Sequence, residues 1–547
     1  MFLRKVYMKL FRKLSVILLI TITSGGFTFS KPVQAASKQE LNWTENVEIS
    51  SIDNAQATDT LSFNVLLNTQ ENLYRLDKKG KPQPALAEKT TISKDGKTYT
   101  FKIRPNAKWS NGDPITAKDF VYSWKRVVNP KTGAQNAFNF FQIKNAKEIN
   151  SGKMALNKLG VSAPDNYTFV VNLARPVSYF KTLISWPLFA PENKKIVEKY
   201  GKAYGTTANK TVSSGPFVLK GWDGANGSWS LVKNPYYWDK KHVHLNKINE
   251  SVVKDSQTGL NLYQNKKVQE TVLVGEQVPQ FKGQKDLIFR HASSGIRMDL
   301  NQEKIKAFKN RNVRRALSLA INRKQLTKRV LQDGSLEPKG FVPVGLAKDP
   351  STGKDFAKQT EVKAAVTKNM PLAKKLLAKG LKATNTKKLD LELMVDDSPN
   401  TKKTGEFVQG QLEQLPKVKV HIKSLPKVQR ITKEGKSDFD MVIATWTSTF
   451  SDPINFLDVW ESDSTYNNSK WRNKKFDNYT ELSENRYATN PAQRWTQLQK
   501  AEHELMNDQG TIPLYQVTQA QLLDTKVKGI IYNGSGVPYD WKYAYIK

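Results

Sequence analysis

Cysteine is absent from all 547 residues of this chain. Without a thiol, the protein can form no disulfide bond, no cysteine nucleophile and no cysteine-based zinc or iron–sulfur site. Histidine is nearly as scarce, and of its five positions only His242 and His244 stand close together. A lone H-x-H pair lacks the further ligands that a zinc site needs. We therefore expect no metal and no other cofactor, and we interpret this pair as part of a solvated aromatic loop.

The common signatures of catalysis are missing as well. No G-x-S-x-G, G-x-x-x-x-G-K, G-x-G-x-x-G or H-E-x-x-H motif occurs in the chain. Asp438 and Asp440 stand two residues apart, so a strand would place both carboxylates on one face, as in a glycosidase pair. No surrounding pattern supports that chemistry. We expect the protein not to be an enzyme.

Acidic residues are few for the number of basic ones. The chain has 50 Asp and Glu against 86 Lys and Arg, a net charge of +36, and residues 1–36 hold six of the bases and no acid, which leaves +30 for the rest. Such a field attracts polyanions without specifying which. The lysines are scattered and form no nucleic-acid module. We expect no nucleic-acid partner and favour anionic cell-wall polymers or a membrane surface; a charge that only keeps the protein soluble is the alternative.

The first 36 residues have the pattern of a signal peptide. Basic residues between Arg4 and Lys13 precede a short apolar run from Val16 to Phe29, and Val33-x-Ala35 matches the cleavage rule. This run is shorter than a typical transmembrane helix, and no later apolar run is close to that length. No cysteine follows the run, so we expect no lipid anchor. The sequence thus predicts an exported protein.

Periodic apolar residues predict alternating helices and strands in the remainder. We expect helices within 61–76, 120–128, 312–331, 407–415 and 491–506, and strands at 98–103, 168–173, 389–395, 418–422, 439–446 and 512–515. A strand, helix and strand at 248–253, 260–263 and 270–274 suggest a βαβ unit. The alternation favours α/β lobes, and the length requires more than one domain.

The stretch Ser437–Trp460 combines a predicted buried strand with a polar loop. Phe439–Trp446 is apolar, and the loop that follows contains Thr449, Phe450 and Asp452. Ligand sites of α/β proteins often lie where a buried strand ends. The alternative is a core strand that runs into a surface turn.

Several segments, taken in order, resemble one family. DGKTYTFKIRPNAKWSNGDPITAKDFVYSWKR (95–126), SSGPFVL (213–219), LVKNPYYWD (231–239), NVRRALSLAINRKQL (312–326) and the 439–457 stretch are similar to the oligopeptide-binding proteins of ABC importers, extracellular solute-binding protein family 5. The similarity covers nearly all of the chain after the predicted signal peptide.

The resemblance implies a fold, a function and partners. The fold would be α/β, two-lobed and three-domain, of the periplasmic-binding-protein type (class II, cluster C), with hinge closure. The protein would be a monomer that captures an oligopeptide between its lobes and delivers it to an ABC permease at the cell surface of a Gram-positive-type bacterium. The implied organisation is a signal peptide at 1–36, domain I at 37–80, 206–298 and 517–547, domain II at 81–205 and domain III at 299–516.

The resemblance also implies ligand contacts, and one of them departs from the family. Tyr122 and Trp446 match ligand-facing aromatic residues, and Phe450 lies beside them in the pocket segment. Thr449 stands where the family has an aspartate that binds the peptide's α-ammonium group. Three explanations remain open: Asp452 reaches the ammonium, the ligand has no free N-terminus there or binds in a shifted register, or the protein no longer serves nutrient uptake. The alternative functions are a receptor for a modified or signalling peptide or a non-peptide ligand, and a charge-retained adhesion protein.

Overall fold

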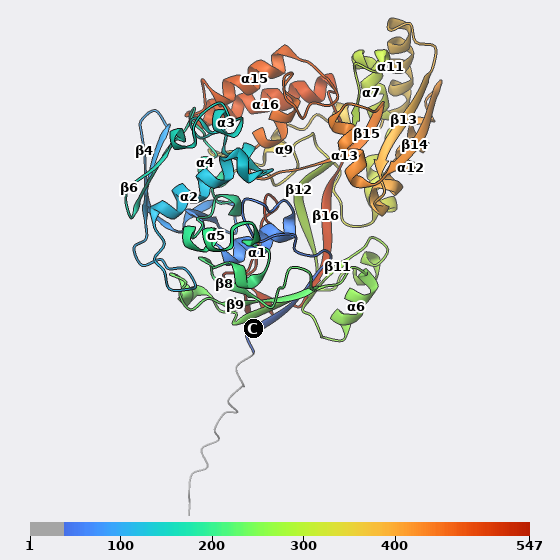
Figure 1. Ribbon diagram of the computed structural model, residues 1–547. Helices are drawn as coiled ribbons and strands as arrows, with labels where there is room; N and C mark the ends of the chain where they lie inside the picture. Colours follow the sequence, from blue (N-terminus) through green and yellow to red (C-terminus); the bar gives the residue numbers. More distant parts are fainter. Residues whose placement is uncertain (1–37) are drawn as a thin grey trace, which may run out of the picture. The chain divides into compact units, whose positions relative to one another are not determined.

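Three β-sheets of four or more strands organise residues 38–547, the part of the chain that the computed structural model describes (Figure 1). Residues from Gln39 to Lys547 form one compact unit. The predicted signal peptide at 1–36 lies outside the described residues. No helix among the described residues is long and apolar enough to cross a membrane.

The first sheet has the order β1-β10-β9-β8 and is parallel only between β1 and β10. Its strands are β1 (Glu40–Glu45), β10 (Lys247–Val252), β9 (Ser228–Lys233) and β8 (Phe217–Lys220). A second four-stranded sheet, antiparallel throughout, has the order β4-β5-β7-β6. Its strands are β4 (Ala87–Ile92), β5 (Thr98–Ile103), β7 (Thr168–Asn172) and β6 (Val161–Asp165).

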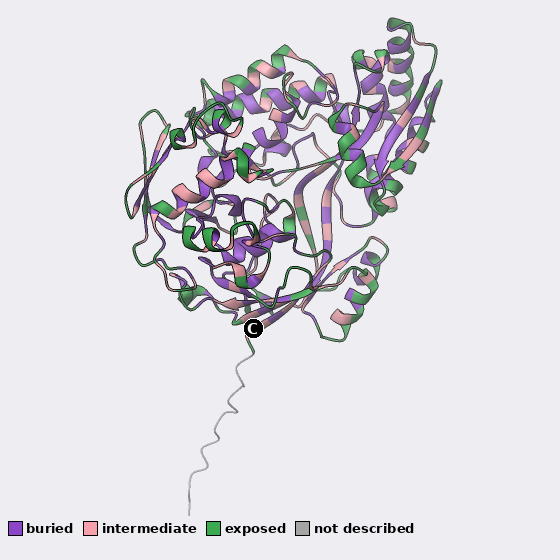
Figure 2. Cartoon of the chain, viewed as in Figure 1, coloured by how far each residue is buried: buried purple, intermediate pink, exposed green. Residues whose placement is uncertain are grey.

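The largest sheet has six strands in the order β11-β16-β12-β15-β13-β14. They are β11 (Glu270–Leu273), β16 (Ile512–Leu523), β12 (Leu287–Leu300), β15 (Met441–Thr447), β13 (Leu389–Asp396) and β14 (Val418–Leu425). The pairs of β13 with β14 and β15 are parallel, and the other pairs are antiparallel. Along β13 most residues are buried, because helices pack against the parallel part of the sheet (Figure 2).

Helices and short hairpins connect the sheets. The longer helices are α1 (Thr60–Thr69), α2 (Ala117–Val128), α6 (Ser256–Gln264), α7 (Arg311–Ala320), α11 (Met370–Ala383), α12 (Pro399–Leu412), α13 (Lys427–Gly435), α15 (Lys474–Glu484) and α16 (Pro491–Asp508). The shorter ones are α3 (Ala146–Asn150), α4 (Phe180–Leu183), α5 (Lys194–Tyr200), α8 (Arg323–Gln325), α9 (Phe356–Gln359), α10 (Lys363–Val366) and α14 (Ile454–Leu457). Two short hairpins are formed by β2 (Tyr74–Leu76) with β3 (Pro82–Pro84) and by β18 (Ile531–Tyr532) with β19 (Tyr539–Asp540). The segments that flank the second hairpin, β17 (Val527–Lys528) and β20 (Tyr545–Ile546), also pair antiparallel.

Two separate hydrophobic cores account for most of the buried apolar residues. One contains the two four-stranded sheets together with segments 341–366 and 450–506, and the other contains α7, α11, α12 and the strands around β13. β12 and β16 run side by side for most of their length, and their ends belong to different clusters (Figure 1). The pairing register of these two strands shifts between His291 and Gly295. They therefore connect the second core to the rest of the chain through an irregular ladder.

The predicted βαβ unit is wrong in its pairing. A strand, a helix and a strand do follow one another as β10, α6 and β11, but β10 pairs with β1 and β9 in the first sheet. β11 instead forms an edge of the six-stranded sheet, antiparallel to β16. The apolar pattern identified the elements, whereas the pairs of β10 with β1 and of β11 with β16 join residues more than 200 positions apart.

The single helix predicted at 312–331 is interrupted. α7 ends at Ala320, and Asn322 then caps α8 by accepting a hydrogen bond from the backbone N–H of Gln325. Two arginines of this stretch, Arg314 and Arg323, are buried. Arg323 donates to the carbonyl oxygens of Pro513 and Val366 at 2.6 and 2.7 Å. A buried guanidinium satisfied in this way fixes several loops at once.

Candidate functional site

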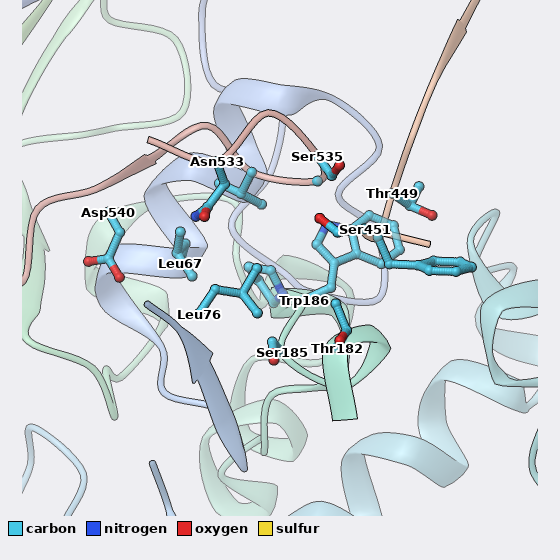
Figure 3. A pocket seen from close by; sticks show the side chains of 14 residues that line it. Leu67, Leu76, Thr182, Ser185, Trp186, Thr449, Ser451, Asn533, Ser535 and Asp540 are labelled. Atoms are coloured by element: carbon cyan, nitrogen blue, oxygen red, sulfur yellow. The ribbon is translucent and has the colours of Figure 1, made fainter. Parts of the chain in front are cut away.

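A small pocket lies where four distant segments of the chain meet (Figure 3). Its walls come from α1 and β2, from the residues in and after α4, from the loop after β15, and from the turn between β18 and β19. The lining residues are Leu67, Leu76, Thr182, Ser185, Trp186, Pro187, Thr449, Phe450, Ser451, Asn533, Ser535, Gly536, Val537 and Asp540. Two of the residues predicted to bind ligand, Thr449 and Phe450, are therefore in this pocket.

The turn between β18 and β19 is held against the loop after β15. The backbone N–H of Gly536 donates to the carbonyl of Ser448 at 2.8 Å. Gly536 has a φ of +69°, and a Cβ atom there would lie 2.8 Å from the carbonyl oxygen of Thr449. Glycine is the residue that tolerates both this backbone conformation and so close an approach. The two segments thereby form one continuous wall.

The other wall is fixed by aromatic packing and side-chain amides. The ring of Trp186 packs on Phe63 of α1 with centroids 4.6 Å apart. Asn72 donates to the carbonyl of Ser185 at 2.9 Å, which ties the segment after α4 to the chain between α1 and β2. Neither contact involves neighbours in sequence, so the pocket depends on the tertiary fold.

Asp540 is the only ionisable residue among the lining residues, and its charge is already compensated. Arg75 donates to its two carboxylate oxygens at 2.6 and 2.8 Å, and both side chains are buried. Glu71 completes the group by accepting from Arg75 at 3.2 Å. A bidentate pair of this kind leaves little of the carboxylate's charge for a ligand.

Ser535 presents a different kind of group. It is 5% exposed, and its hydroxyl has no hydrogen-bond partner among residues 38–547. A buried hydroxyl without a partner is uncommon, because the lost contact with water is not replaced. The Ser535 oxygen is shielded from solvent as well, so it is an unpaired polar group beside the pocket and is not exposed to it.

Asp452 does not line the pocket and is occupied by Arg494. The guanidinium of Arg494 donates to both carboxylate oxygens of Asp452, at 2.8 and 2.9 Å. Arg494 also binds Glu484 at 3.0 Å, and Glu484 in turn binds Arg175 at 2.5 Å. Burial opposes the ionisation of Glu484, but the charges of Arg175 and Arg494 outweigh it and lower the pKa of this carboxyl. Asp452 is thus one end of a chain of four alternating charges.

Phe450 contributes to the pocket and also to a contact behind it. Its ring stacks on Tyr179 with centroids 4.5 Å apart and an angle of 9° between the planes. Tyr179 lies within hydrogen-bonding distance, 3.3 Å, of Glu484. The same aromatic pair therefore joins the pocket segment to the charged chain and to the residues before α4.

The other predicted contacts, Trp446 and Tyr122, lie outside this pocket. Trp446 is half-buried, donates its indole N–H to the carbonyl of Asn455 at 2.6 Å, and packs edge-on against Tyr466. Tyr122 is half-buried on α2, where burial and the charge of Glu192 raise its pKa to about 12. Their assignment as ligand contacts stays a prediction.

Sequence patterns did not reveal Trp186, Ser535, Asp540 or Arg75. Arg75 and Asp540 are 465 residues apart, and no local motif relates them. The aromatic run around Trp186 was a weak signal, since large aromatic residues are common in binding pockets and in cores alike.

The histidine and aspartate residues considered for metal binding and for a glycosidase pair have other partners in the structure. His242 pairs with Asp239 at 2.6 Å, and no cluster of three or more His, Asp or Glu within residues 38–547 is arranged to hold a metal ion. Asp440 accepts from the backbone N–H of Glu392 at 3.0 Å and pairs with Lys304, while Asp438 pairs with Lys433.

Two hydrophobic cores joined by paired strands, with a pocket walled by distant segments, define a two-lobed α/β binding protein. The model of the bacterial extracellular solute-binding proteins, family 5 (middle), matches residues 81–468, and this chain belongs to that family. The resemblance found in the sequence and the predicted fold class are both confirmed.

Individual relatives cover nearly the whole chain. The dipeptide-binding protein of Lactococcus lactis subsp. cremoris is 36% identical over 530 residues, which cover 94% of this chain and 96% of the relative. The structure of Listeria monocytogenes OppA bound to peptide is 37% identical, with a TM-score of 0.78 over 94% of this chain and 100% of that one. That of the pheromone receptor PrgZ is 38% identical, with a TM-score of 0.79 over 93% and 100%. The family is one of binding proteins.

Proposed function

We propose that this protein is an extracellular receptor that captures peptides between its lobes and delivers them to an ABC permease. The observation that supports this most is the pocket itself, which Thr449 and Phe450 share with segments near Trp186 and Ser535. Relatives of similar length carry the names of peptide-binding proteins. A peptide is held well by such a site because its N–H and C=O groups are the same in every sequence.

Mass spectrometry of what copurifies with the protein tests this proposal directly. We expect peptides to be released on denaturation, and titration calorimetry with peptides of two to ten residues to show binding. Loss of the gene should reduce peptide uptake by the cell. If nothing peptidic copurifies and no peptide length binds, the proposal is wrong.

A dedicated receptor for one modified or signalling peptide is the second candidate. It is favoured by Thr449, a neutral residue where the sequence resemblance implies an aspartate, and by the similarity to a protein described as a pheromone receptor. The same mass spectrometry separates the two. A mixture of unrelated sequences supports general uptake, and a single dominant species supports the dedicated receptor.

Retention at the surface of a Gram-positive-type cell is proposed to depend on charge. The net charge of +30 after residue 36 and the absence of cysteine support this, since a thioether-linked lipid requires a cysteine. Attraction to anionic wall polymer or lipid is screened by salt. Washing intact cells with 1 M salt should therefore release most of the protein into the supernatant, and a protein that stays on the washed cells contradicts charge retention.

A further inference from the structure

A second cavity, of about 450 Å³, shares no lining residue with the pocket at Thr449. Its walls come from the start of α8, from the loop before Gly340 and from the residues on either side of α10. Four of its lining residues are basic and two are acidic, which leaves a net charge of +2. These six are Arg323, Lys324, Lys339, Lys368, Glu337 and Glu361.

The charge of Arg323 has no acidic partner at close range. Its side chain is buried and donates to the carbonyl oxygens of Pro513 and Val366 at 2.6 and 2.7 Å and to the hydroxyl of Ser318 at 2.8 Å. These neutral groups satisfy the N–H donors, but they carry no full negative charge to balance the guanidinium. Burial lowers the pKa of Arg323 to about 9, and the charge of Glu337 opposes this shift only in part.

The lysines around the cavity differ in how far they are neutralised. Lys339 pairs with Glu361 at 2.8 Å, so these two charges cancel. Lys368 donates to the neutral side-chain oxygen of Gln411 at 3.1 Å. Lys324 is exposed and forms no ion pair with any of residues 38–547. Two ammonium groups at this cavity therefore keep their charge.

One acidic residue, Glu337, remains to oppose three cations. Glu337 is exposed and pairs with no basic side chain among residues 38–547. A cavity with low-dielectric walls concentrates the field of such unbalanced charges and attracts an anion. An excess of two charges is matched by a phosphate monoester dianion, whereas a carboxylate carries only one charge. Lysine binds phosphate as a point charge and does not require one fixed geometry.

We propose that this cavity binds a phosphate ester, with Lys324 and Lys368 contacting the phosphate oxygens and Arg323 supplying a fixed positive charge. The phosphate belongs to a free solute or to the repeating unit of an anionic polymer, and both present the same group. A volume of about 450 Å³ equals that of roughly fifteen water molecules and accommodates the phosphate with part of its alcohol. The inference goes beyond peptide binding and does not depend on it.

Titration calorimetry with defined phosphate compounds tests the proposal. Glycerol 3-phosphate and a soluble poly(glycerol phosphate) are titrated at low ionic strength and at a pH where the monoester is a dianion. We expect binding that weakens as salt is added, and weaker binding of acetate. Tighter binding of the polymer per phosphate identifies the polymer as the ligand, and equal or tighter binding of the monomer identifies a free ester. If neither compound binds, or acetate binds as tightly, the proposal is wrong.

Replacement of the two lysines tests where the phosphate binds. The double variant Lys324→Gln/Lys368→Gln should weaken binding of the phosphate compounds by about tenfold or more. The matched control is Lys374→Gln/Lys375→Gln, which removes the same charge from two exposed residues of α11 that do not line the cavity. The control should bind like the wild type. Equal weakening of both proteins would show that net charge alone attracts the anion and would overturn the proposal.

Two further variants separate charge from structural damage. Lys324→Arg/Lys368→Arg keeps both charges and should retain the wild-type affinity within about threefold. Glu337→Gln removes the unpaired acidic residue of the cavity and should strengthen phosphate binding by about threefold. Glu276→Gln, at a surface ion pair that is not part of the lining, should leave it unchanged. Unchanged or weaker binding by Glu337→Gln contradicts a phosphate in this cavity.

Discussion

Asp452 shows how a single residue can be assigned a different role by its partners. From the sequence alone, one explanation for the neutral Thr449 was that Asp452 binds the ligand's ammonium group. In the structure both of its carboxylate oxygens accept from Arg494, and its first oxygen also caps the backbone N–H of Ile454 at 3.0 Å. These contacts hold the loop after β15, and the assignment of Asp452 as a ligand contact stays a prediction.

Replacing Asp452 by asparagine should therefore affect stability first. The change leaves the buried guanidinium of Arg494 with Glu484 as its remaining anionic partner, and breaking a buried pair in this way costs about 3 kcal/mol. Urea unfolding should show this loss in the free energy of unfolding. The ratio of affinities for peptides with a free α-amine and with an N-acetylated α-amine should not change.

Glu276→Gln is a suitable control for that measurement. Glu276 pairs with Lys403 on the surface, where exposed ion pairs contribute little, so its stability should match that of the wild type. An Asp452→Asn protein of full stability that loses affinity only for free-amine peptides would instead identify Asp452 as a ligand contact.

Local sequence patterns predicted which segments are helices or strands better than they predicted which strands pair. The strand expected at 98–103 is β5 with the same limits, and the helix expected at 120–128 is α2, which begins three residues earlier with a capping box of Thr116 and Asp119. The helix expected from Pro491 is α16, capped by Asn490. Alternation of apolar residues and capping side chains are local signals, so one sequence is sufficient to find them.

Strand partners and pocket walls could not be predicted in this way. β16 was expected to span only Ile512–Tyr515, yet it extends to Leu523 because it pairs with β11 and β12 at once. The pocket walls likewise meet through contacts such as that of Gly536 with Ser448. Thr449 and Phe450 were found because the resemblance identified their segment, whereas Ser535 and Asp540 carry no signal in the sequence.

The whole molecule contains several carboxyl groups whose pKa is raised by burial. The affected residues and their pKa values are Glu192 and Glu250 at about 8, and Glu270, Glu461 and Glu502 at about 7. In the unfolded chain the same groups have a pKa of about 4.3. The folded protein therefore binds more protons than the unfolded chain between these limits, and its stability falls as the pH rises through them.

We expect the free energy of unfolding to decrease between pH 6.5 and 8. Burial lowers the pKa of His291 and His503, which makes stability rise with pH only up to their unfolded value of about 6.5. Above that pH the buried carboxyls determine how stability depends on pH. Each of them lowers the free energy of unfolding by up to about 1.4 kcal/mol per pH unit until the pH reaches its folded pKa. Urea unfolding at half-unit intervals measures this profile.

The variant Glu250→Gln tests whether Glu250 contributes to the dependence of stability on pH. Glu250 is fully buried, and an amide of the same shape does not ionise, so the variant should be more stable than the wild type at pH 8 and have a flatter profile. The surface variant Glu276→Gln should follow the wild-type profile. A stability that stays constant or rises from pH 6.5 to 8 would contradict the prediction.

The stacked pair of Phe450 and Tyr179 has a consequence for affinity at a distance. Phe450 lines the pocket on one side and meets Tyr179 on the other, next to the pair of Arg175 with Glu484. In a protein whose binding-competent arrangement is only partly populated, the apparent dissociation constant is the intrinsic one divided by that population. Tyr179 packs on the back of Phe450 and does not line the pocket, so a substitution of Tyr179 would change this population without removing a lining residue. We therefore expect a substitution of Tyr179 to change the peptide concentration at which the protein is half occupied, although this side chain does not line the pocket.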